Sequence, residues 1–225
     1  MAEQERLGPD GRILPSDALD RVEWTTEAAD AADLAGRYDA WADAYDHDLL
    51  DGEDYGSVIA RVVDAMLRHV PAEARVLELG CGSGLVGKAL REQGYIRLEG
   101  LDLSPGMLER ARQTGAYRSL RIADLNAGIP EDAAVFDAVL AVGTLTYLEP
   151  TVLAEIHRVL VPRGQFAFTF QPAVHAARGF KEIEDRLLSE GHLRRLYTSE
   201  SFSPLPKSMP DVRFRVSVLQ RWERE

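Results

Sequence analysis

Three glycines, Gly80, Gly82 and Gly84, stand where a short apolar segment gives way to a helical pattern. Residues 75–79 have the composition of a buried parallel strand, and residues 85–93 return to helical spacing. Glycines lack the Cβ atom that would keep a ligand away from the backbone, and they tolerate positive φ angles. The free N–H groups at the start of the following helix favour a negatively charged group above the turn. The stretch therefore predicts a loop that holds a nucleotide-like ligand.

The glycines alone do not identify the ligand, because Gly82, Gly84 and Gly87 also fit the dinucleotide-binding pattern G-x-G-x-x-G. A turn whose glycines serve only packing is a further alternative. Glu78 places a carboxylate directly before the loop, which disfavours a pyrophosphate and suits an ammonium group. Residues 96–101 read as a second strand that ends at Asp102, where a carboxylate can accept hydrogen bonds from two ribose hydroxyls.

Further strands and helices must position these acids. A brief strand over residues 120–123 ends at Asp124, which would lie at the ligand crevice of an open α/β sheet, although a turn cap is the simpler alternative. Residues 136–142 are almost continuously apolar, as in a central strand. The later pattern predicts segments in this order: a helix over 149–160 ended by Pro162, a turn at 163–164, a strand over 165–170, a helix over 180–188 and two terminal strands within 193–202 and 212–218.

Four segments in this order resemble the class I S-adenosylmethionine-dependent methyltransferases, and they span about half of the chain. They are Val76-Leu-Glu-Leu-Gly-Cys-Gly-Ser-Gly84, Gly100-Leu-Asp-Leu-Ser-Pro-Gly-Met-Leu108, Ala123-Asp-Leu125, and Phe136-Asp-Ala-Val-Leu-Ala-Val-Gly143 with Leu145-Thr-Tyr-Leu148. Upstream, Tyr38-Asp-Ala-Trp-Ala-Asp-Ala-Tyr-Asp46 followed by Asp48-Leu49 is similar to the entry segment of the Williams-Beuren-syndrome-region methyltransferase-like subgroup.

The resemblance implies a fold and a division of the chain. We expect an α/β protein with a Rossmann-like, seven-stranded, mostly parallel sheet, an antiparallel C-terminal edge, helices on both faces and an N-terminal helical lid. Residues 1–55 would form the lid or extension. Residues 56–225 would form the methyltransferase domain, with a substrate-side insert at 171–210.

The resemblance also implies S-adenosylmethionine as the cofactor. In the family, an acid at the position of Asp124 accepts the adenine amino protons, and the next backbone N–H, that of Leu125, meets a ring nitrogen. The residues expected to bind the cofactor are Tyr38, Trp41, Tyr45, Glu78, Gly80, Cys81, Gly82, Asp102, Leu103, Met107, Ala123, Asp124, Leu125, Val142 and Gly143.

An aromatic stripe in the N-terminal segment allows two interpretations. Leu34, Tyr38, Trp41 and Tyr45 fall on one face of a helix, which by itself is typical of a core. As part of a lid, Tyr38 and Tyr45 would hydrogen-bond the methionine carboxylate of the cofactor, and Trp41 would cover the cofactor or the acceptor.

The implied activity is methyl transfer by direct in-line displacement to an unidentified acceptor, most simply a small molecule. The catalytic residues stay unknown. Tyr147, His175 and His192 are conceivable general bases, each with a packing or surface alternative, and Thr144, Thr146 and Tyr147 are the polar groups expected nearest the acceptor. An NAD-dependent oxidoreductase and a non-catalytic S-adenosylmethionine-binding module are the alternatives.

The amino-acid composition restricts the kinds of partner that we expect the chain to bind. The formal net charge is −11, and the first 55 residues hold 16 acids against 4 bases, which argues against binding a nucleic-acid backbone. Cys81 is the single cysteine, and neither a membrane-length apolar run nor a signal-peptide core occurs. We therefore expect a cytoplasmic protein without a membrane partner. The five histidines lack metal-ligand spacing, so no metal is expected. Nothing in the sequence indicates the oligomeric state.

Overall fold

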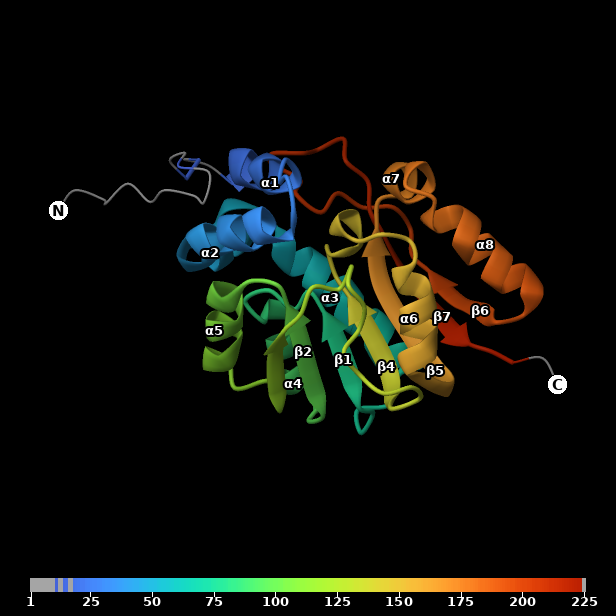
Figure 1. Cartoon of the computed structure of the whole chain (residues 1–225). Coiled ribbons are helices and arrows are strands. Elements are labelled where there is room, and N and C mark those ends of the chain that lie inside the picture. The colour runs from blue at the N-terminus through green and yellow to red at the C-terminus, as the bar shows by residue number, and fades with distance from the viewer. Residues whose placement is uncertain (1–10, 12–13, 16–17, 224–225) are drawn as a thin grey trace.

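The computed structural model describes residues 11, 14–15 and 18–223, and it places helices on both faces of a seven-stranded sheet (Figure 1). The strand order is β3-β2-β1-β4-β5-β7-β6. The first five strands of this order are parallel, whereas β7 runs antiparallel to both β5 and β6. The predicted mostly parallel sheet with an antiparallel C-terminal edge is confirmed.

The helices and strands alternate along most of the chain. The strands are β1 (Val76–Leu79), β2 (Leu98–Asp102), β3 (Ser119–Ile122), β4 (Phe136–Ala141), β5 (Leu160–Phe170), β6 (Leu193–Thr198) and β7 (Arg215–Arg221). The α-helices are α1 (Ala18–Thr26), α2 (Ala31–His47), α3 (Tyr55–His69), α4 (Leu85–Glu92), α5 (Pro105–Gln113), α6 (Val152–Val159), α7 (Pro172–Ala177) and α8 (Phe180–Glu190). Two short helical turns complete the set, η1 (Asp48–Gly52) and η2 (Leu145–Tyr147).

Because the central strands are paired in register, their carboxyl ends lie side by side. Leu79 at the end of β1 is paired with Leu101 of β2 on one side and with Ala141 of β4 on the other. The residues that follow these strands therefore emerge at the same edge of the sheet, which is where an open α/β sheet forms its ligand crevice.

The core consists of two apolar layers, one on each face of the sheet. Because successive side chains of a strand point to opposite faces, Val76 packs in the layer with α3 and α4, and Leu77 packs in the layer with α6 and α8. Both side chains are fully buried. The short parallel strands are thus covered on both faces, as their apolar composition predicts.

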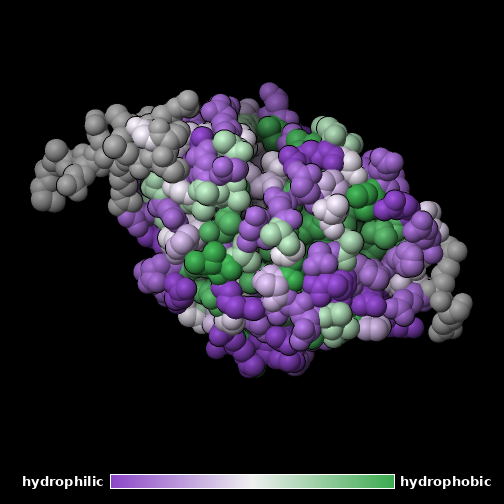
Figure 2. Space-filling model, in the orientation of Figure 1, coloured by the Kyte–Doolittle hydropathy of each residue, from purple (hydrophilic) through white to green (hydrophobic). Residues whose placement is uncertain are grey.

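Polar side chains cover much of the outer surface. Figure 2 shows hydrophilic residues along the lower edge of the face seen in Figure 1, with hydrophobic patches in its middle. Among the described residues, the large apolar side chains with notable exposure are Leu50, Leu67, Ile96 and Ile122. Within the described part of the chain, no helix combines the length and the apolarity that crossing a membrane requires.

The junction between α6 and β5 differs from the prediction. The helix ends at Val159, and β5 begins at Leu160, so that Pro162 lies inside the strand and not in a helix-ending turn. A bulge accommodates it: the register against β4 shifts between Phe136 and Ala138, and Arg163 has a φ of 66°. The sequence pattern predicted a turn because such a bulge uses turn-type residues.

Two N-terminal helices lie beyond the carboxyl ends of the parallel strands (Figure 1). Helix α2 is fixed to the start of α5 by Asp39, whose Oδ1 accepts hydrogen bonds from the Gly106 N–H, at 2.7 Å, and from the Ser104 hydroxyl. Ser104 in turn caps α5 by accepting a hydrogen bond from the Met107 N–H at 3.0 Å. Residues 1–10, 12–13 and 16–17 of the proposed 1–55 segment lie outside the described residues.

We expect Asp39→Ala to lower the free energy of unfolding by about 1 kcal/mol, because the N-terminal N–H groups of α5 and the Ser104 hydroxyl lose an acceptor. For a chain of this size, thermal denaturation should show a Tm lower by roughly 2–4 °C. Asp43→Ala is the control, since Asp43 lies on the same helix and pairs at 3.3 Å with Arg110 on the surface. Equal effects of the two substitutions would contradict the anchoring role of Asp39.

Candidate functional site

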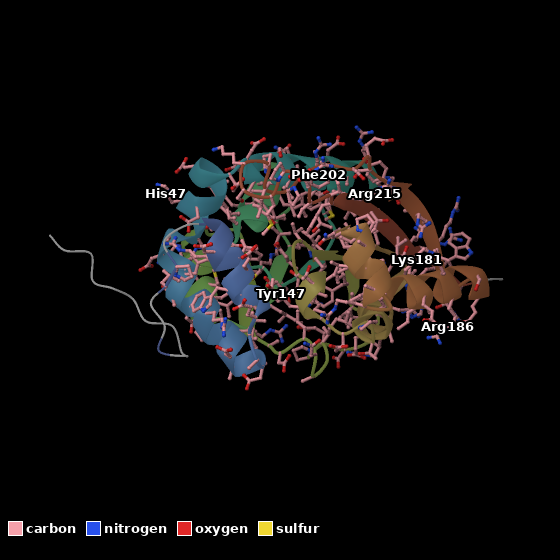
Figure 3. The ribbon with its side chains drawn as sticks, turned by 90° about the horizontal axis from the view of Figure 1, so that it is seen from above. His47, Tyr147, Lys181, Arg186, Phe202 and Arg215 are labelled. Atoms are coloured by element: carbon pink, nitrogen blue, oxygen red, sulfur yellow. The ribbon has the colours of Figure 1, made fainter. Side chains whose placement is uncertain are left out.

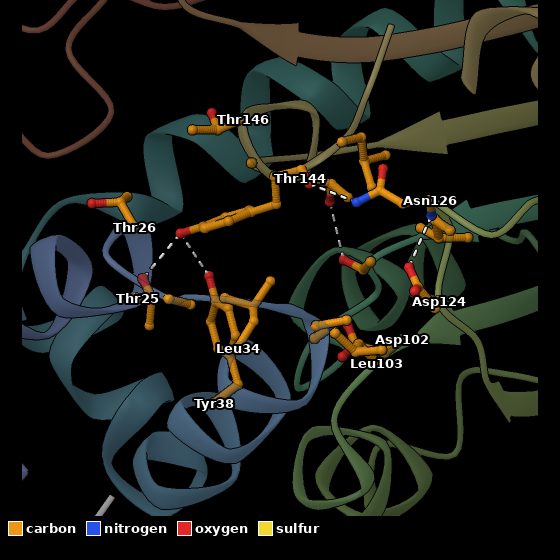
Figure 4. A pocket seen from close by; sticks show the side chains of 18 of the residues that line it. Thr25, Thr26, Leu34, Tyr38, Asp102, Leu103, Asp124, Asn126, Thr144 and Thr146 are labelled. Atoms are coloured by element: carbon orange, nitrogen blue, oxygen red, sulfur yellow. Dashed lines mark hydrogen bonds between the residues drawn. The ribbon is translucent and has the colours of Figure 1, made fainter. Parts of the chain in front are cut away.

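A cavity of about 380 Å³ lies between the N-terminal helices and the carboxyl ends of the strands. Its wall combines residues far apart in the sequence, and Figure 4 shows the side chains facing a common space. The lining residues are Thr25, Thr26, Ala28, Ala29, Asp30, Ala31, Leu34, Tyr38, Tyr45, Gly80, Gly82, Asp102, Leu103, Met107, Ala123, Asp124, Leu125, Asn126, Val142, Gly143, Thr144, Thr146, Tyr147, Leu148, Glu149 and Arg178.

The glycine loop after β1 forms one wall of the cavity. Gly80 and Gly82 have φ angles of 64° and 54°, in the left-handed region that side chains disfavour. A Cβ at Gly80 would lie 2.4 Å from the Thr144 hydroxyl oxygen, whereas a Cβ at Gly82 would meet no atom within 4 Å. Gly80 is therefore needed for packing, and Gly82 leaves the backbone open to a ligand.

Asp102 is held in one orientation at the end of β2. Its Oδ2 accepts a hydrogen bond from the Gly82 N–H at 2.8 Å, and its Oδ1 accepts one from the Ser104 N–H at 2.9 Å. Burial raises the pKa of this carboxyl, while the backbone hydrogen bonds partly oppose that shift. Each oxygen keeps a lone pair, so the group can also accept hydrogen bonds from the hydroxyls of a ligand.

Asn126 connects two sides of the cavity, and it was not predicted. Its Nδ2 donates to the Tyr147 carbonyl at 3.1 Å, and its Oδ1 accepts from the Glu149 N–H at 2.8 Å. Its own N–H donates to Asp124 Oδ1 at 2.9 Å. The loop after β3 is thereby fixed to the segment after β4. One asparagine in a turn carries no sequence signal for this role.

Tyr147 occupies the middle of the molecule when it is viewed from above, whereas Lys181 and Arg186 lie on α8 away from it (Figure 3). The Tyr147 hydroxyl oxygen accepts a hydrogen bond from the Tyr38 hydroxyl at 3.0 Å. It also lies 3.0 Å from Thr25 Oγ1. Thr25 uses its own proton on the Val22 carbonyl, at 2.8 Å, so Tyr147 donates to Thr25. A chain of hydroxyls thus joins η2 to both N-terminal helices (Figure 4).

Burial raises the pKa of Tyr147 and that of Tyr38. Both phenols therefore stay protonated at neutral pH. Tyr147 can orient a ligand through its hydroxyl, but it is a poor general base under these conditions.

The cavity includes twelve of the fifteen residues predicted to bind a cofactor, and the other three lie behind its wall. Trp41 is 1% exposed, and its indole N–H donates to Asp48 Oδ2 at 2.6 Å. Cys81 is buried, close to Gly100, and burial raises the pKa of its thiol. Glu78 is 2% exposed and accepts a hydrogen bond from the Tyr117 hydroxyl at 2.7 Å.

Of the three candidate general bases, Tyr147 lines the cavity and the two histidines do not. His175 is buried beside aromatic rings, and its Nε2 lies 2.9 Å from Glu184, because the first turn of α7 directs it into the apolar layer. His192 follows α8, where its ring contacts His157 at 6.0 Å between ring centroids. Neither histidine is placed to act on a ligand in the cavity.

The lining residues that no sequence pattern marks lie mainly between Thr25 and Ala31, a stretch that includes the end of α1, its connection to α2 and the first residue of α2. Others are Glu149 and Arg178. The Arg178 guanidinium donates to the Leu148 carbonyl at 2.9 Å and to Glu149 at 3.3 Å. No local motif marks these residues. They reach the site only through the packing of α1, α2 and α7 around η2.

The donor set fits a nucleoside with a cationic substituent. Asp102 and Asp124 provide fixed carboxylates, Met107 provides a buried apolar surface, and Gly82 provides open backbone. Throughout the described residues, no group of three or more histidines, cysteines or acids could hold a metal ion.

The chain matches a methyltransferase family profile, and its relatives in sequence include three named methyltransferases. The family profile described as "Methyltransferase domain" matches residues 77–168. Human methyltransferase-like protein 27 is 34% identical over 179 residues, which cover 75% of this chain and 68% of that protein. Malonyl-[acyl-carrier protein] O-methyltransferase from Salmonella typhimurium is 38% identical over 122 residues, or 52% of this chain and 47% of that protein. The 18S rRNA (guanine(1575)-N(7))-methyltransferase of Saccharomyces cerevisiae matches a shorter region, at 37% identity over 32% of this chain and 26% of that protein. The chain thus spans two thirds of the first relative and about half or less of the other two.

Solved structures share the fold. A chain from the complex between the Haloferax volcanii Trm112 methyltransferase activator and a methyltransferase superposes with a TM-score of 0.62. The two chains are 22% identical, and the match covers 83% of this chain and 98% of that one. At this identity the likeness supports the fold alone.

The buried Glu78 carboxyl predicts how stability depends on pH. Burial raises the pKa of Glu78 to about 8, with the nearby Asp102 adding to the shift and the Tyr117 hydrogen bond opposing it. The folded protein then keeps a proton that the unfolded chain releases near pH 4.5, so stability should fall as pH rises from about 5 to 8. Glu78→Gln removes this titration. Above pH 8, the free energy of unfolding of the variant should exceed that of the wild type by a few kcal/mol. Chemical denaturation of the cofactor-free proteins across this pH range would measure it, and parallel curves would refute the assignment.

Proposed function

The chain belongs to the class I S-adenosylmethionine-dependent methyltransferases, and from this premise we propose that its methyl acceptor is a small molecule that binds beneath α1 and α2. The observation that carries the proposal is the enclosure of the cavity by α1, α2 and their connection. Thr25 of α1 and Tyr38 of α2 both hydrogen-bond the Tyr147 hydroxyl. At about 380 Å³, the cavity is at the lower end of the range for small-molecule sites, about 300–1,000 Å³. The cofactor would occupy much of this volume, so the space left for an acceptor group is limited.

We assign the cofactor to the strand-end side of the cavity. Asp102 would accept hydrogen bonds from the ribose hydroxyls, and Asp124 with the Leu125 N–H would contact the adenine ring. Met107 would pack against the ring, and the Gly80–Gly82 backbone would adjoin the methionine part. The support is that these residues line one cavity and that Asp102 is fixed by two backbone hydrogen bonds.

Bound S-adenosylmethionine supplies an electrophilic methyl carbon, so the protein needs no covalent nucleophile. The chain's own contribution is to position the acceptor and to exclude water, which together lower the barrier by several kcal/mol. Thr25, Thr26 and Thr146 are well placed to orient the acceptor, because they line the side of the cavity opposite Asp102 and Asp124 (Figure 4). Tyr147, which is hydrogen-bonded to Thr25, lines the cavity as well.

The lack of a suitable general base among the cavity residues that the structure describes restricts which chemical groups the protein can methylate. The described lining residues include no histidine, and burial keeps the Tyr147 phenol protonated by raising its pKa. We infer that the acceptor attacks as a neutral amine or as an already ionised oxygen or sulfur. Such groups need no protein base with a pKa near 7.

Two segments would determine which acceptor enters. We propose that residues 1–55 act as the lid and that the insert at 171–210 of the 56–225 domain contributes through Arg178 at the mouth. The acidity of the lid supports exclusion of a phosphate backbone. A nucleic-acid acceptor is the second candidate, since one relative is named as a methyltransferase of 18S rRNA.

Asp102→Asn should weaken S-adenosylmethionine binding at least tenfold, or about 1.4 kcal/mol, because the amide can accept hydrogen bonds through only one of its two polar atoms. Isothermal titration calorimetry measures this directly. Asp137→Asn is the matched control: Asp137 lies near the amino end of β4, where its carboxylate accepts a hydrogen bond from the Arg75 N–H at 2.7 Å. Equal affinities for Asp102→Asn and the wild type would remove Asp102 from the site.

A turnover screen tests the acceptor class. The protein should release S-adenosylhomocysteine with at least one small amine, thiol or carboxylic acid, and Tyr147→Phe should lower kcat/KM about tenfold or more while cofactor affinity changes little. Total RNA and a peptide mixture serve as the competing acceptors. Turnover with RNA alone would overturn the small-molecule proposal, and the absence of turnover with every class would favour a non-catalytic binding module.

A further inference from the structure

Gly87 completes the G-x-G-x-x-G pattern, but it does not line the cavity. A Cβ at Gly87 would lie 2.1 Å from the Tyr117 hydroxyl oxygen, and a Cβ at Gly84 would lie 3.1 Å from Cε2 of the same ring. The two glycines at the start of α4 therefore form a slot that Tyr117 occupies. The third glycine of the pattern serves a tyrosine of this chain and not a pyrophosphate.

The Tyr117 side chain connects two distant parts of the fold. The residue lies between α5 and β3, and its hydroxyl donates to Glu78 Oε2, at the end of β1, with a distance of 2.7 Å. Glu78 directly precedes the loop whose Gly80 and Gly82 line the cavity. Tyr117 thus fixes a carboxyl immediately behind the cofactor loop.

The surroundings of Glu78 contain no cation among the described residues. The titratable groups near it are the Tyr117 phenol from the α5–β3 connection, Asp102 from β2, the Tyr55 phenol from α3, and the Cys81 thiol from the loop itself. A buried carboxylate without a cationic partner is strongly disfavoured, and a well-packed apolar residue would be more stable there. The carboxyl therefore suits a ligand that brings a positive charge.

We propose that Tyr117 is a positioning residue for the cofactor: it holds Glu78 behind the glycine loop so that the carboxyl gives its proton to solvent when the cationic S-adenosylmethionine binds. The ionised carboxylate then offsets the positive charge of the ligand. Burial, which raises the pKa of Glu78 to about 8, keeps the group neutral in the cofactor-free protein at neutral pH. The inference rests on the cofactor and not on the identity of the acceptor.

The test is the pH dependence of S-adenosylmethionine affinity, measured by titration calorimetry between about pH 6 and 9.5. The Glu78→Gln variant shows how the titration of the cofactor's own amino group changes the affinity with pH. Relative to this variant, the affinity of the wild type should rise with pH and level off near pH 8. Because the Tyr117 hydrogen bond lowers the pKa of Glu78, Tyr117→Phe should move this rise upward by about one pH unit and weaken binding about tenfold at pH 7.

Tyr95→Phe is the matched control. Tyr95 is fully buried and donates to the Val70 carbonyl at 2.7 Å, so its loss should lower stability without moving the pH curve. Identical pH curves for Tyr117→Phe, Tyr95→Phe and the wild type would overturn the proposal. So would a Glu78→Gln variant that keeps the full pH dependence of the wild type.

Infrared difference spectra provide a second readout that needs no folded Tyr117 variant. At pH 7, binding of S-adenosylmethionine to the wild type should remove the C=O band of a protonated carboxylic acid, and the change should be absent in Glu78→Gln. An unchanged band would overturn the proposal. Because neither measurement involves a methyl acceptor, failure here is distinct from failure of the acceptor assignment.

Discussion

The hydrogen bond from the Gly82 N–H to the Asp102 carboxylate joins the glycine loop to the end of β2, and the geometry of the cavity depends on it. It can form because β1 and β2 are parallel neighbours in register, which brings the residues after Leu79 beside Asp102. The positive φ of Gly82 turns its N–H toward the carboxylate and leaves no Cβ in the cavity. Sheet topology, loop conformation and ligand chemistry are therefore linked through one contact.

The N-terminal helices complete the site by two separate attachments. Asp39 fixes α2 to the start of α5, beside the Ser104 that also bonds to Asp102. The hydroxyls of Tyr38, Tyr147 and Thr25 fix the same helices to η2 on the other side. The cavity thus depends on side-chain contacts between segments about 65 to 120 residues apart, and not on the sheet alone.

The strand-end residues could be predicted from the sequence because each follows an apolar run and the topology of an open α/β sheet brings such ends together. The pattern could not show which way each side chain points. Glu78 and Trp41 belong to recognisable motifs, yet Tyr117 and Asp48 hold them behind the wall of the cavity. Asn126 and Arg178 reach the site only through tertiary packing, and neither lies in a local pattern that predicts it. The bulge at Pro162 was missed because its residues are those of an ordinary turn.

The central claim is that acids at adjacent strand ends and a glycine loop together hold the nucleoside of S-adenosylmethionine. A crystal structure of the complex with S-adenosylhomocysteine tests it most directly. The account predicts both ribose hydroxyls within hydrogen-bond distance of the Asp102 carboxylate and the adenine amino group beside Asp124, with the loop at Gly80 and Gly82 against the amino-acid part. A ligand bound elsewhere, or a ribose that does not contact Asp102, would contradict it.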